Sequence, residues 1–452
     1  MKSHLDEANC RQAENFKIHI VTRAFPIENT MGSHSYLLSL AVYLKQLGFQ
    51  VSLLLLDPSP GGNIPVFVIP GLARELFRVS ARDNIQLCHL LLRFKSLQDW
   101  LVSPIWTAYY LLAEALHDMS FTAWHDPMKR IHQILRQFIT VGNSRVRPWD
   151  ALTTSDEIEF CRNAFVSDKP DIVIANYAFL ADVFSAIPPD KPVLRVIITH
   201  DVRHQRVKEF ARKKIPLLGE SEWDLKTESE QLQKAQLLLA IQKEDANVFR
   251  KVSPGCEVLL MPMPATCQSC ASEQIPARCL FVGSYANHNL HALNWLLQNV
   301  WPLVLRLVPC ASLHVCGTVC ETIKTAAPNV SFSGRVDDLG AEYGAAEVCL
   351  LPLVVGSGLK IKLVEALSYG RACVSTPAGV QGVREITNKA VMVAESAEDF
   401  AKAVQRILIK PDKRRQMEEQ AHKFVRERFS PQVVYQPIID RIYRHMGRSK
   451  GE

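Results

Sequence analysis

Two lysines stand at the predicted start of a helix, directly after a glycine-rich loop. They are Lys360 and Lys362, within the stretch LLPLVVGSGLKIKLVEALSYGRACVSTPAGVQG that covers residues 350–382. Unpaired N–H groups and the positive end of the helix dipole make such a position suitable for an anion such as a phosphate. Cations there oppose the dipole and cost stability unless something negative lies beside them. The pair therefore indicates an anion site.

A strand, a loop and a helix are predicted to position these lysines. Residues 350–353 end an apolar run typical of a buried strand, and the glycines at 356 and 358 let the loop backbone approach a ligand closely. Apolar residues then repeat at helical spacing up to Gly370, a C-terminal cap, before another buried strand at 372–379. An ordinary strand–helix–strand unit with exposed lysines would show the same pattern, because glycine loops alone are weak signals.

A second group of polar residues follows the buried strand predicted at 193–199. His200 and Asp201 come directly after it, and the carboxyl ends of strands are where α/β proteins place ligands. His200 could donate a hydrogen bond to a substrate hydroxyl. Asp201 could orient it, or could instead cap the helix that follows.

The overall composition describes a globular protein large enough for two domains. The chain has 452 residues, 48% of them hydrophobic and 22% charged. The net charge of +6 fits anionic substrates or an anionic membrane surface and does not demand nucleic acid. The twelve cysteines lack a dense framework, so that reduced thiols in a cytosolic protein are expected.

The first domain is predicted at 16–264, after a disordered start at 1–15 without the apolar core of a signal peptide. Strands at 16–26 and 50–56 flank a helix at 35–47, which predicts a parallel sheet. Further strands are predicted at 171–176, 193–199, 237–241 and 257–263. The dinucleotide fingerprint of Rossmann domains is absent after the first strand, so dinucleotide binding is not supported.

Residues 82–147 differ from the rest of this domain because they are rich in Leu, Trp and Tyr. They are predicted to form two to four inserted helices, over 87–94 and 100–116 among others, and Pro104 argues against one long helix. The helices could pack on the sheet as core, or could rest an amphipathic face on a bilayer. The sequence contains no run of 18 clean apolar residues, so no membrane span is expected.

The second domain is predicted at 278–428. It opens with a strand and the turn Gly283-Ser284, and a long helix follows at 289–307. Strands are expected at 312–317, 330–338 and 390–395, and helices at 398–409 and 412–428.

The run Gly-Ser-Gly-Leu-Lys-Ile-Lys-Leu-Val-Glu-Ala-Leu, followed by Tyr-Gly-Arg-Ala-Cys-Val-Ser-Thr, resembles the donor-site motif of group 1 (family 4-like) retaining glycosyltransferases. It is most similar to the subgroup with Gly-x-Gly-x-Lys-x-Lys. The resemblance implies the α/β GT-B fold, two Rossmann-like parallel-sheet domains facing across a cleft. It also implies that residues 429–452 form a helix crossing back to the first domain. Many members carry a second glutamate eight residues before Glu365, where this sequence has Ser357.

The resemblance also implies roles for individual residues. By position, Glu365 would hold the ribose of a sugar nucleotide, and the lysines would meet its diphosphate. The implied donor-binding residues are Gly283, Ser284, Arg335, Gly356, Ser357, Gly358, Leu359, Lys360, Lys362 and Glu365. The implied catalytic residues are His200, Asp201 and Lys362. The implied acceptor-side loop is Gly32, Ser33 and His34.

The expected function is transfer of a hexosyl-type sugar from a nucleotide sugar to a glycan, lipid-linked or other acceptor, with retention of configuration. No Asp-x-Asp motif suited to a metal–diphosphate bridge is evident, so neither a metal nor another cofactor is expected. The expected location is cytoplasmic, with peripheral contact at the inner face of the membrane through 82–147. Two alternatives remain: a GT-B nucleotide-sugar epimerase that needs no acceptor, and a non-catalytic binding subunit, which the serine at 357 would favour.

Overall fold

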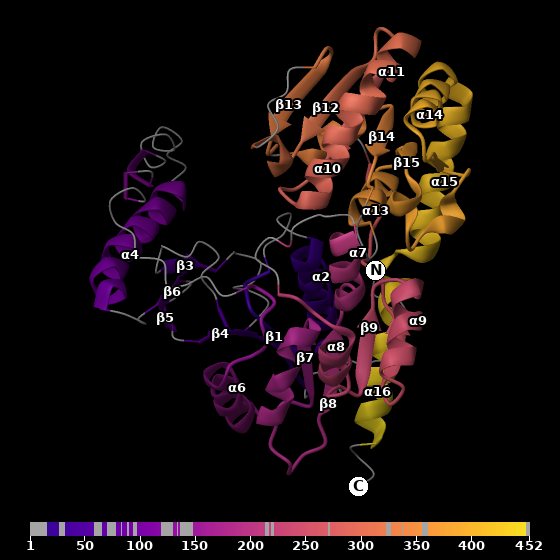
Figure 1. Cartoon of the computed structure of the whole chain (residues 1–452). Coiled ribbons are helices and arrows are strands. Elements are labelled where there is room, and N and C mark those ends of the chain that lie inside the picture. The colour runs from indigo at the N-terminus through magenta and orange to yellow at the C-terminus, as the bar shows by residue number, and fades with distance from the viewer. Residues whose placement is uncertain are drawn as a thin grey trace.

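The computed structural model describes residues 16–26, 32–57, 66–69, 78–82, 84–87, 90–93, 97–118, 130–132, 134–135, 148–212, 217, 221–269, 272–321, 327–336, 338–354 and 360–448. Figure 1 shows two α/β domains, one above the other, and a smaller unit that projects from the first. The expected α/β class with two parallel sheets is confirmed.

The N-terminal domain is built on a parallel sheet of seven strands in the order β10-β9-β8-β7-β1-β2-β4. The strands are β1 (Lys17–Thr22), β2 (Gln50–Leu55), β4 (Arg78–Ala81), β7 (Ile172–Asn176), β8 (Leu194–Ile198), β9 (Leu237–Ala240) and β10 (Glu257–Leu260). The helices are α2 (Gly32–Gln46), α6 (Ser155–Asp168), α7 (Arg203–Arg212), α8 (Leu225–Leu232), α9 (Lys243–Val252) and the 3₁₀ helix η2 (Ala178–Ala186). The central strands are buried on both faces, as continuous apolar runs predict.

The C-terminal domain has a parallel sheet of six strands in the order β13-β12-β11-β14-β15-β16. The strands are β11 (Arg278–Val282), β12 (Ser312–Cys316), β13 (Val330–Gly334), β14 (Val348–Leu351), β15 (Cys373–Ser375) and β16 (Val391–Val393). The longer helices are α10 (Asn287–Trp295), α11 (Trp301–Leu307), α12 (Leu339–Ala345), α13 (Ile361–Ser368), α14 (Ala397–Ile409) and α15 (Pro411–Arg428). A π-helical turn, η3 (Leu296–Val300), joins α10 to α11, and short 3₁₀ turns lie at η4 (Thr318–Glu321), η5 (Pro377–Val380) and η6 (Arg384–Ile386).

Each parallel sheet has one point at which the strand order reverses. In the N-terminal sheet it lies between β1 and β7, and in the C-terminal sheet between β11 and β14. Connections leave in opposite directions there, which opens a crevice at the carboxyl ends of the strands where α/β proteins bind ligands. The residues that follow these four strands are therefore the first candidates for a site.

The insertion contains a three-stranded antiparallel sheet, β3-β6-β5, and one long helix, α4 (Leu97–Asp118). The strands are β3 (Val66–Val68), β5 (Asn84–Leu87) and β6 (Leu90–Arg93). The helix expected over 87–94 is therefore wrong, because a short apolar run does not distinguish a buried strand from a helix. The argument from Pro104 against one long helix is also wrong. Pro104 lies inside α4 on its exposed side, where the backbone carbonyl that loses its partner can face water.

The last helix, α16 (Pro431–Arg448), packs against the N-terminal domain. Tyr435 Oη is 2.9 Å from Ser39 Oγ on α2, and Arg441 Nε donates to Glu257 Oε2 on β10 at 2.7 Å. The chain thus crosses between the domains twice. The two crossings are hydrogen-bonded to each other, because the N–H of Ala265 donates to the carbonyl of Phe429 at 2.7 Å.

Candidate active site between the two domains

Lys360 lies in the crevice between the two domains. It is the N-cap residue of α13, and only 7% of it is exposed. Burial lowers its pKa to about 8, while Glu209, Asp245 and Asp201 of the N-terminal domain act to raise it. The ammonium group therefore faces the N-terminal domain, and Figure 1 shows α13 directly above α7. Of the loop predicted to bind a donor, Gly356, Ser357, Gly358 and Leu359 lie outside the described residues.

Protein carboxylates supply the negative charge that the two lysines need. Lys362 Nζ lies 2.6 Å from Glu365 Oε2, one turn further along α13, and Lys360 has the three carboxylates named above. The two lysines therefore do not by themselves require a bound diphosphate, which corrects the argument from sequence. Glu365, the predicted ribose ligand, is paired with Lys362 in this structure.

The turn after β11 lies near Lys360. Gly283 packs backbone to backbone against Gly317, and the exposed Ser284 accepts a hydrogen bond through its carbonyl from Asn289 Nδ2 at 3.0 Å. His288, in the first turn of α10, has a pKa lowered to about 4, first by burial and then by Arg206 and Lys360. The start of α10, the start of α13 and α7 of the other domain therefore lie close together.

Arg335, another predicted donor residue, lies at the edge of the C-terminal sheet. It is exposed and follows β13, the edge strand, and β12 separates β13 from the switch-point strand β11.

His200 is held in one tautomer by a chain of hydrogen bonds. Thr22 Oγ1 donates to the carbonyl of Ala24 and accepts from Asn176 Nδ2, each at 3.1 Å. The amide oxygen of Asn176 then faces His200 Nε2 at 2.7 Å, so that Nε2 carries the hydrogen. Burial, with help from His34 and Arg203, lowers the pKa of His200 to about 3. The ring is neutral and offers Nδ1 as an acceptor, whereas the sequence analysis expected a donor.

The structure brings His200 together with two of the three predicted acceptor-side residues. His34 is close enough to lower the pKa of His200, and the Ser33 side chain is hydrogen-bonded to Tyr177 beside it. Gly32, Ser33 and His34 form the first turn of α2, whereas the sequence analysis expected a loop there. The predicted helix began at residue 35, so the difference is one turn.

Asp201 does not cap the helix that follows it. The carboxylate of Glu228, on α8, accepts from the N–H groups of Arg203 and His204 at 2.9 Å each and so occupies the start of α7. Asp201 instead lies 3.5 Å from Arg206 and 3.8 Å from Arg203. Its Oδ1 is buried without a hydrogen-bond partner.

Asp245, in the first turn of α9, is a site residue that was not predicted from the sequence. Only 4% of it is exposed; Oδ1 accepts from Gln242 Nε2 at 2.7 Å, and Oδ2 is buried without a partner. Burial raises its pKa to about 7. Asp245 comes five residues after β9, so attention to every strand end could have found it. Within the described ranges, no group of three or more His, Cys, Asp or Glu residues is arranged to hold a metal ion.

Known proteins resemble most of the C-terminal domain in sequence and more than nine-tenths of the chain in fold. Residues 276–410 match the family described as "Glycosyl transferases group 1". A Klebsiella pneumoniae protein, described as an uncharacterized 44.6 kDa protein in the cps region, is 26% identical over 172 residues. That match covers 35% of this chain and 44% of the relative.

Three solved structures illustrate the similarity of fold. Sucrose-phosphate synthase from Thermosynechococcus elongatus has a TM-score of 0.63 at 15% identity, over 96% of this chain and 100% of that one. Anabaena HepE in complex with UDP-glucose gives 0.58 at 11% identity, over 94% and 99%. WaaG, a glycosyltransferase involved in lipopolysaccharide biosynthesis, gives 0.52 at 12% identity, over 93% and 98%. The chain therefore has the GT-B fold, and its residues 276–410 match the group 1 glycosyl transferases.

Proposed function

We propose that the protein transfers a sugar from a nucleotide-sugar donor to a glycan, lipid-linked or other acceptor, with retention of configuration and without a metal ion. The observation that carries the proposal is the position of Lys360. A buried ammonium group stands at the start of α13, inside the family-matched region, and faces the strand ends of the other domain. Lys360 and the start of α13, in the C-terminal domain, thus face the N-terminal domain and could bind an anion between the two.

The chemistry at this position would be charge stabilisation. As the bond between the anomeric carbon and the diphosphate oxygen breaks, the leaving diphosphate gains negative charge. Lys360 and the first N–H groups of α13 would stabilise that charge, in exchange for the carboxylates that surround Lys360 in the free protein. The acceptor oxygen would bond to the anomeric carbon and its proton would pass to the diphosphate. Removing one such stabilising group costs about 3 kcal/mol in the barrier.

The neighbours suggest where to begin with substrates. HepE was solved with UDP-glucose, WaaG is involved in lipopolysaccharide biosynthesis, and the Klebsiella relative is encoded in a cps region. We propose a UDP-sugar as the first donor to test, and a cell-envelope glycan or its lipid-linked precursor as the acceptor.

A donor screen followed by a turnover assay tests the proposal. Thermal unfolding is measured with UDP-, GDP-, ADP- and CMP-sugars, because a ligand that binds the native state raises the apparent Tm. Nucleotide release and the fate of the sugar are then followed with and without a panel of alkyl glycosides. Transfer to a glycoside supports the proposal. Isomerisation of the donor alone would identify an epimerase, and binding without any turnover a non-catalytic subunit; either result overturns it.

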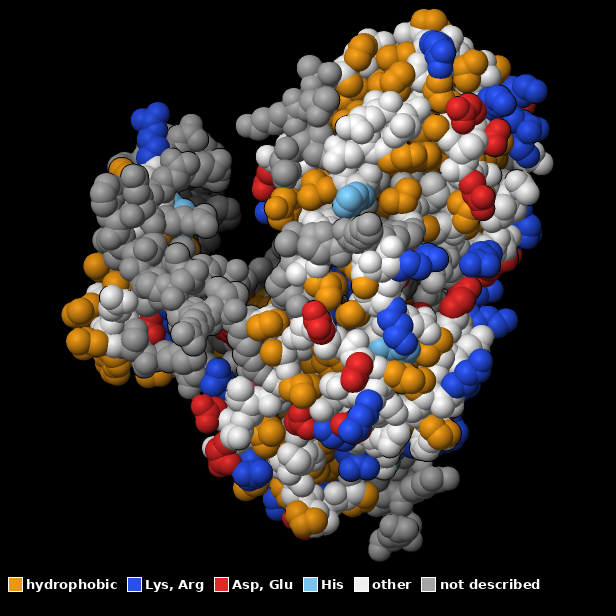
Figure 2. Space-filling view, in the orientation of Figure 1, with side chains coloured by type: hydrophobic (Ala, Val, Ile, Leu, Met, Phe, Trp, Pro, Cys, Tyr) orange, Lys and Arg blue, Asp and Glu red, His pale blue; other side chains and the backbone are white. Residues whose placement is uncertain are grey.

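The exposed face of α4 supports a proposed contact with a membrane. Leu97, Trp100 and Leu101 are exposed by 77%, 58% and 67%, and Ile105, Leu111 and Leu112 continue the same helical face. The inward face instead buries polar Asp99 and Ser103 beside Trp106. Figure 2 shows hydrophobic side chains gathered at the end of the insertion over α4. An apolar face turned outward, with Trp among its residues, suits the boundary between lipid headgroups and acyl chains.

Sedimentation with lipid vesicles tests this contact. The protein is expected to bind vesicles of phosphatidylethanolamine and phosphatidylglycerol. Leu101→Glu is expected to reduce binding about tenfold or more, because it places a charge on the helix face that would enter the membrane. Ile409→Ala, which changes an exposed apolar residue of the other domain, is the control. Equal binding by wild type and Leu101→Glu, or a stable dimer in light scattering that Leu101→Glu dissociates, would contradict the membrane assignment. No described helix is long and apolar enough to cross a membrane.

A further inference from the structure

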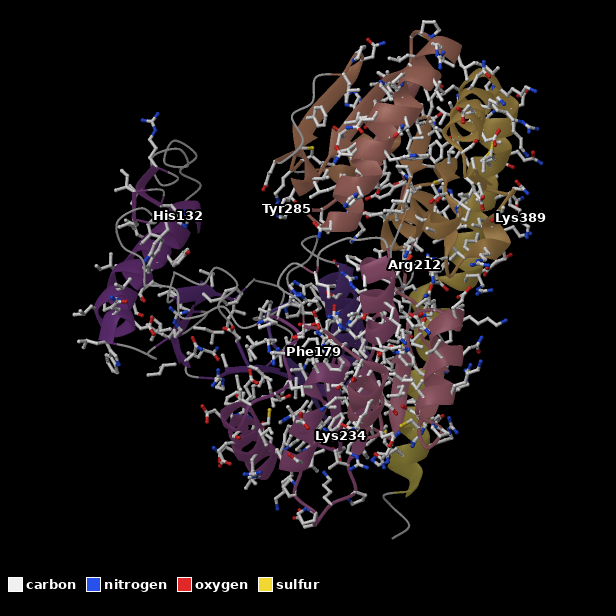
Figure 3. The ribbon with its side chains drawn as sticks, viewed as in Figure 1. His132, Phe179, Arg212, Lys234, Tyr285 and Lys389 are labelled. Atoms are coloured by element: carbon white, nitrogen blue, oxygen red, sulfur yellow. The ribbon has the colours of Figure 1, made fainter. Side chains whose placement is uncertain are left out.

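Four rings meet at the carboxyl ends of β7 and β8. Tyr177 follows β7, and its ring centroid lies 4.2 Å from that of His200 and 5.0 Å from that of Phe179, which it stacks against at 17°. Trp149 meets Tyr177 and Phe179 edge-on, at 5.4 Å and 5.6 Å. Phe179 is labelled in the middle of the N-terminal domain in Figure 3. Neither Trp149 nor Tyr177 was among the site residues predicted from the sequence.

Two of these residues have backbone conformations that favour glycine. His200 has φ 57°. Tyr177 has φ 85° with ψ 152°, a backbone region that residues other than glycine rarely enter. The surroundings hold Tyr177 there, because its ring is packed between His200 and Phe179 and its hydroxyl is hydrogen-bonded to Ser33. Strained residues of this kind cluster at ligand-binding sites, and here two of them touch across neighbouring strands.

Trp149 is exposed but fixed in place. Trp149 is 38% exposed to solvent. Beneath the ring lies the guanidinium of Arg203 at 4.9 Å, itself buried and paired with Asp150. The carbonyl of Trp149 accepts a hydrogen bond from Arg23 Nη1 at 2.7 Å. An exposed aromatic surface that is already ordered loses little freedom when a ligand stacks on it.

This arrangement matches the chemistry of a sugar ring. The face of an aromatic ring is negative and attracts the weakly positive C–H groups on one side of a pyranose. The hydroxyls at the rim of the sugar need polar acceptors, and the neutral Nδ1 of His200 is one.

We infer that Trp149 and Tyr177 form the subsite for the acceptor sugar. This inference rests on the proposed function. Trp149 stacks on the sugar ring, and Tyr177 is a positioning residue that holds His200 so that Nδ1 accepts a hydrogen bond from an acceptor hydroxyl. The occupant is a glycan or glycoside that presents an unsubstituted pyranose face.

Binding of octyl glycosides tests the subsite without requiring turnover. Tryptophan fluorescence and saturation-transfer NMR measure the binding of the glycosides of glucose, galactose, mannose and N-acetylglucosamine. At least one glycoside is expected to bind wild type, and Trp149→Ala is expected to weaken it about tenfold. Trp149→Phe, which keeps an aromatic face, is expected to restore most of the affinity. Ile409→Ala, far from the site, serves as the control for loss of exposed apolar surface.

In the turnover assay, Trp149→Ala is expected to raise the acceptor KM about tenfold and leave the donor KM unchanged. Tyr177→Phe, which loses only the bond to Ser33, is expected to lower kcat with less effect on the acceptor KM. If no glycoside binds wild type, or Trp149→Ala binds as wild type does, the subsite is wrong even if sugar transfer is observed. If glycosides bind through Trp149 but no nucleotide sugar is turned over, the proposed function is wrong and the subsite stands.

Discussion

At the scale of single residues, the proposed anion site depends on Lys360, whose pKa is raised by some neighbours and lowered by burial and by others. Lys360 is buried among groups of both signs, with Asp201, Glu209 and Asp245 opposed by Arg206. A fully exposed lysine would stay protonated to about pH 10. Burial brings the pKa of Lys360 down to about 8, so that its ability to hold an anion depends on pH within a measurable range.

The affinity for a nucleoside diphosphate is therefore expected to fall as pH rises through about 8. The anion binds the protonated ammonium, which is present below the pKa and lost above it. Asp245, whose pKa is raised to about 7, becomes negative as the pH rises through about 7. Its negative charge would repel the anion and so also lower the affinity. Titration calorimetry between pH 6 and 9.5 measures the effect.

Lys360→Arg is the control for this pH dependence, because a guanidinium keeps its charge throughout the range. Its decline in affinity above pH 8 is expected to be smaller than that of wild type. An affinity that is constant up to pH 9.5 in wild type would mean that Lys360 does not contact the anion.

At the scale of elements, α13 is fixed by its end. Gly370 has φ 67° and follows the C-cap residue Tyr369; its N–H donates to the carbonyl of Leu367 at 3.0 Å. This confirms the C-terminal cap predicted from the sequence. His422 of α15 packs against the open side of the glycine, so the end of α13 is tied to the last helix of the domain.

Gly370→Ala is expected to destabilise the protein by about 1–3 kcal/mol. A Cβ at this position would lie 2.5 Å from His422 Nε2, and the left-handed backbone adds strain. Gly255→Ala is the matched control, since a Cβ there would meet no heavy atom within 4 Å. Urea unfolding of both variants measures the difference; equal stability of the two would contradict this account of the helix end.

The elements of the two sheets could be predicted from the sequence, and the contacts of the site could not. Apolar runs such as 172–176 and 194–198 and the glycine stops identify strands and helices because those signals are local. The insertion was predicted less well, since LLLR at 90–93 is a strand only because it pairs with β3 and β5 and packs against α4. The apolar residues of α4 lie at the surface because Trp106 and the polar residues Asp99 and Ser103 occupy the inward face of the helix.

The groups around the candidate site come from distant parts of the sequence. Asp201, Glu209 and Asp245 reach Lys360 only because two domains face each other, and nothing local in the sequence signals that contact. Tyr177 could have been found, because it directly follows a predicted strand at a switch point. Trp149 carried no signal, since its position depends on Arg23 and Arg203.

At the scale of the whole molecule, two domains meet at a crevice and are joined where the chain crosses twice. The crossings lie side by side, through Ala265 and Phe429, and α16 returns to pack on α2 and β10. Lys360 lies on the C-terminal side of that crevice and its carboxylate neighbours on the other.

Titration calorimetry of UDP, GDP and ADP with wild type and with Lys360→Met is the most direct test of a diphosphate site at the start of α13. Methionine matches the length of the lysine stem and lacks its charge. Wild type is expected to bind one of these nucleotides, and Lys360→Met is expected to bind it about 10- to 100-fold more weakly, as loss of a hydrogen bond to a charged group would give. Binding of none of the three by wild type, or equal affinity in the two proteins, would contradict a diphosphate site at the start of α13.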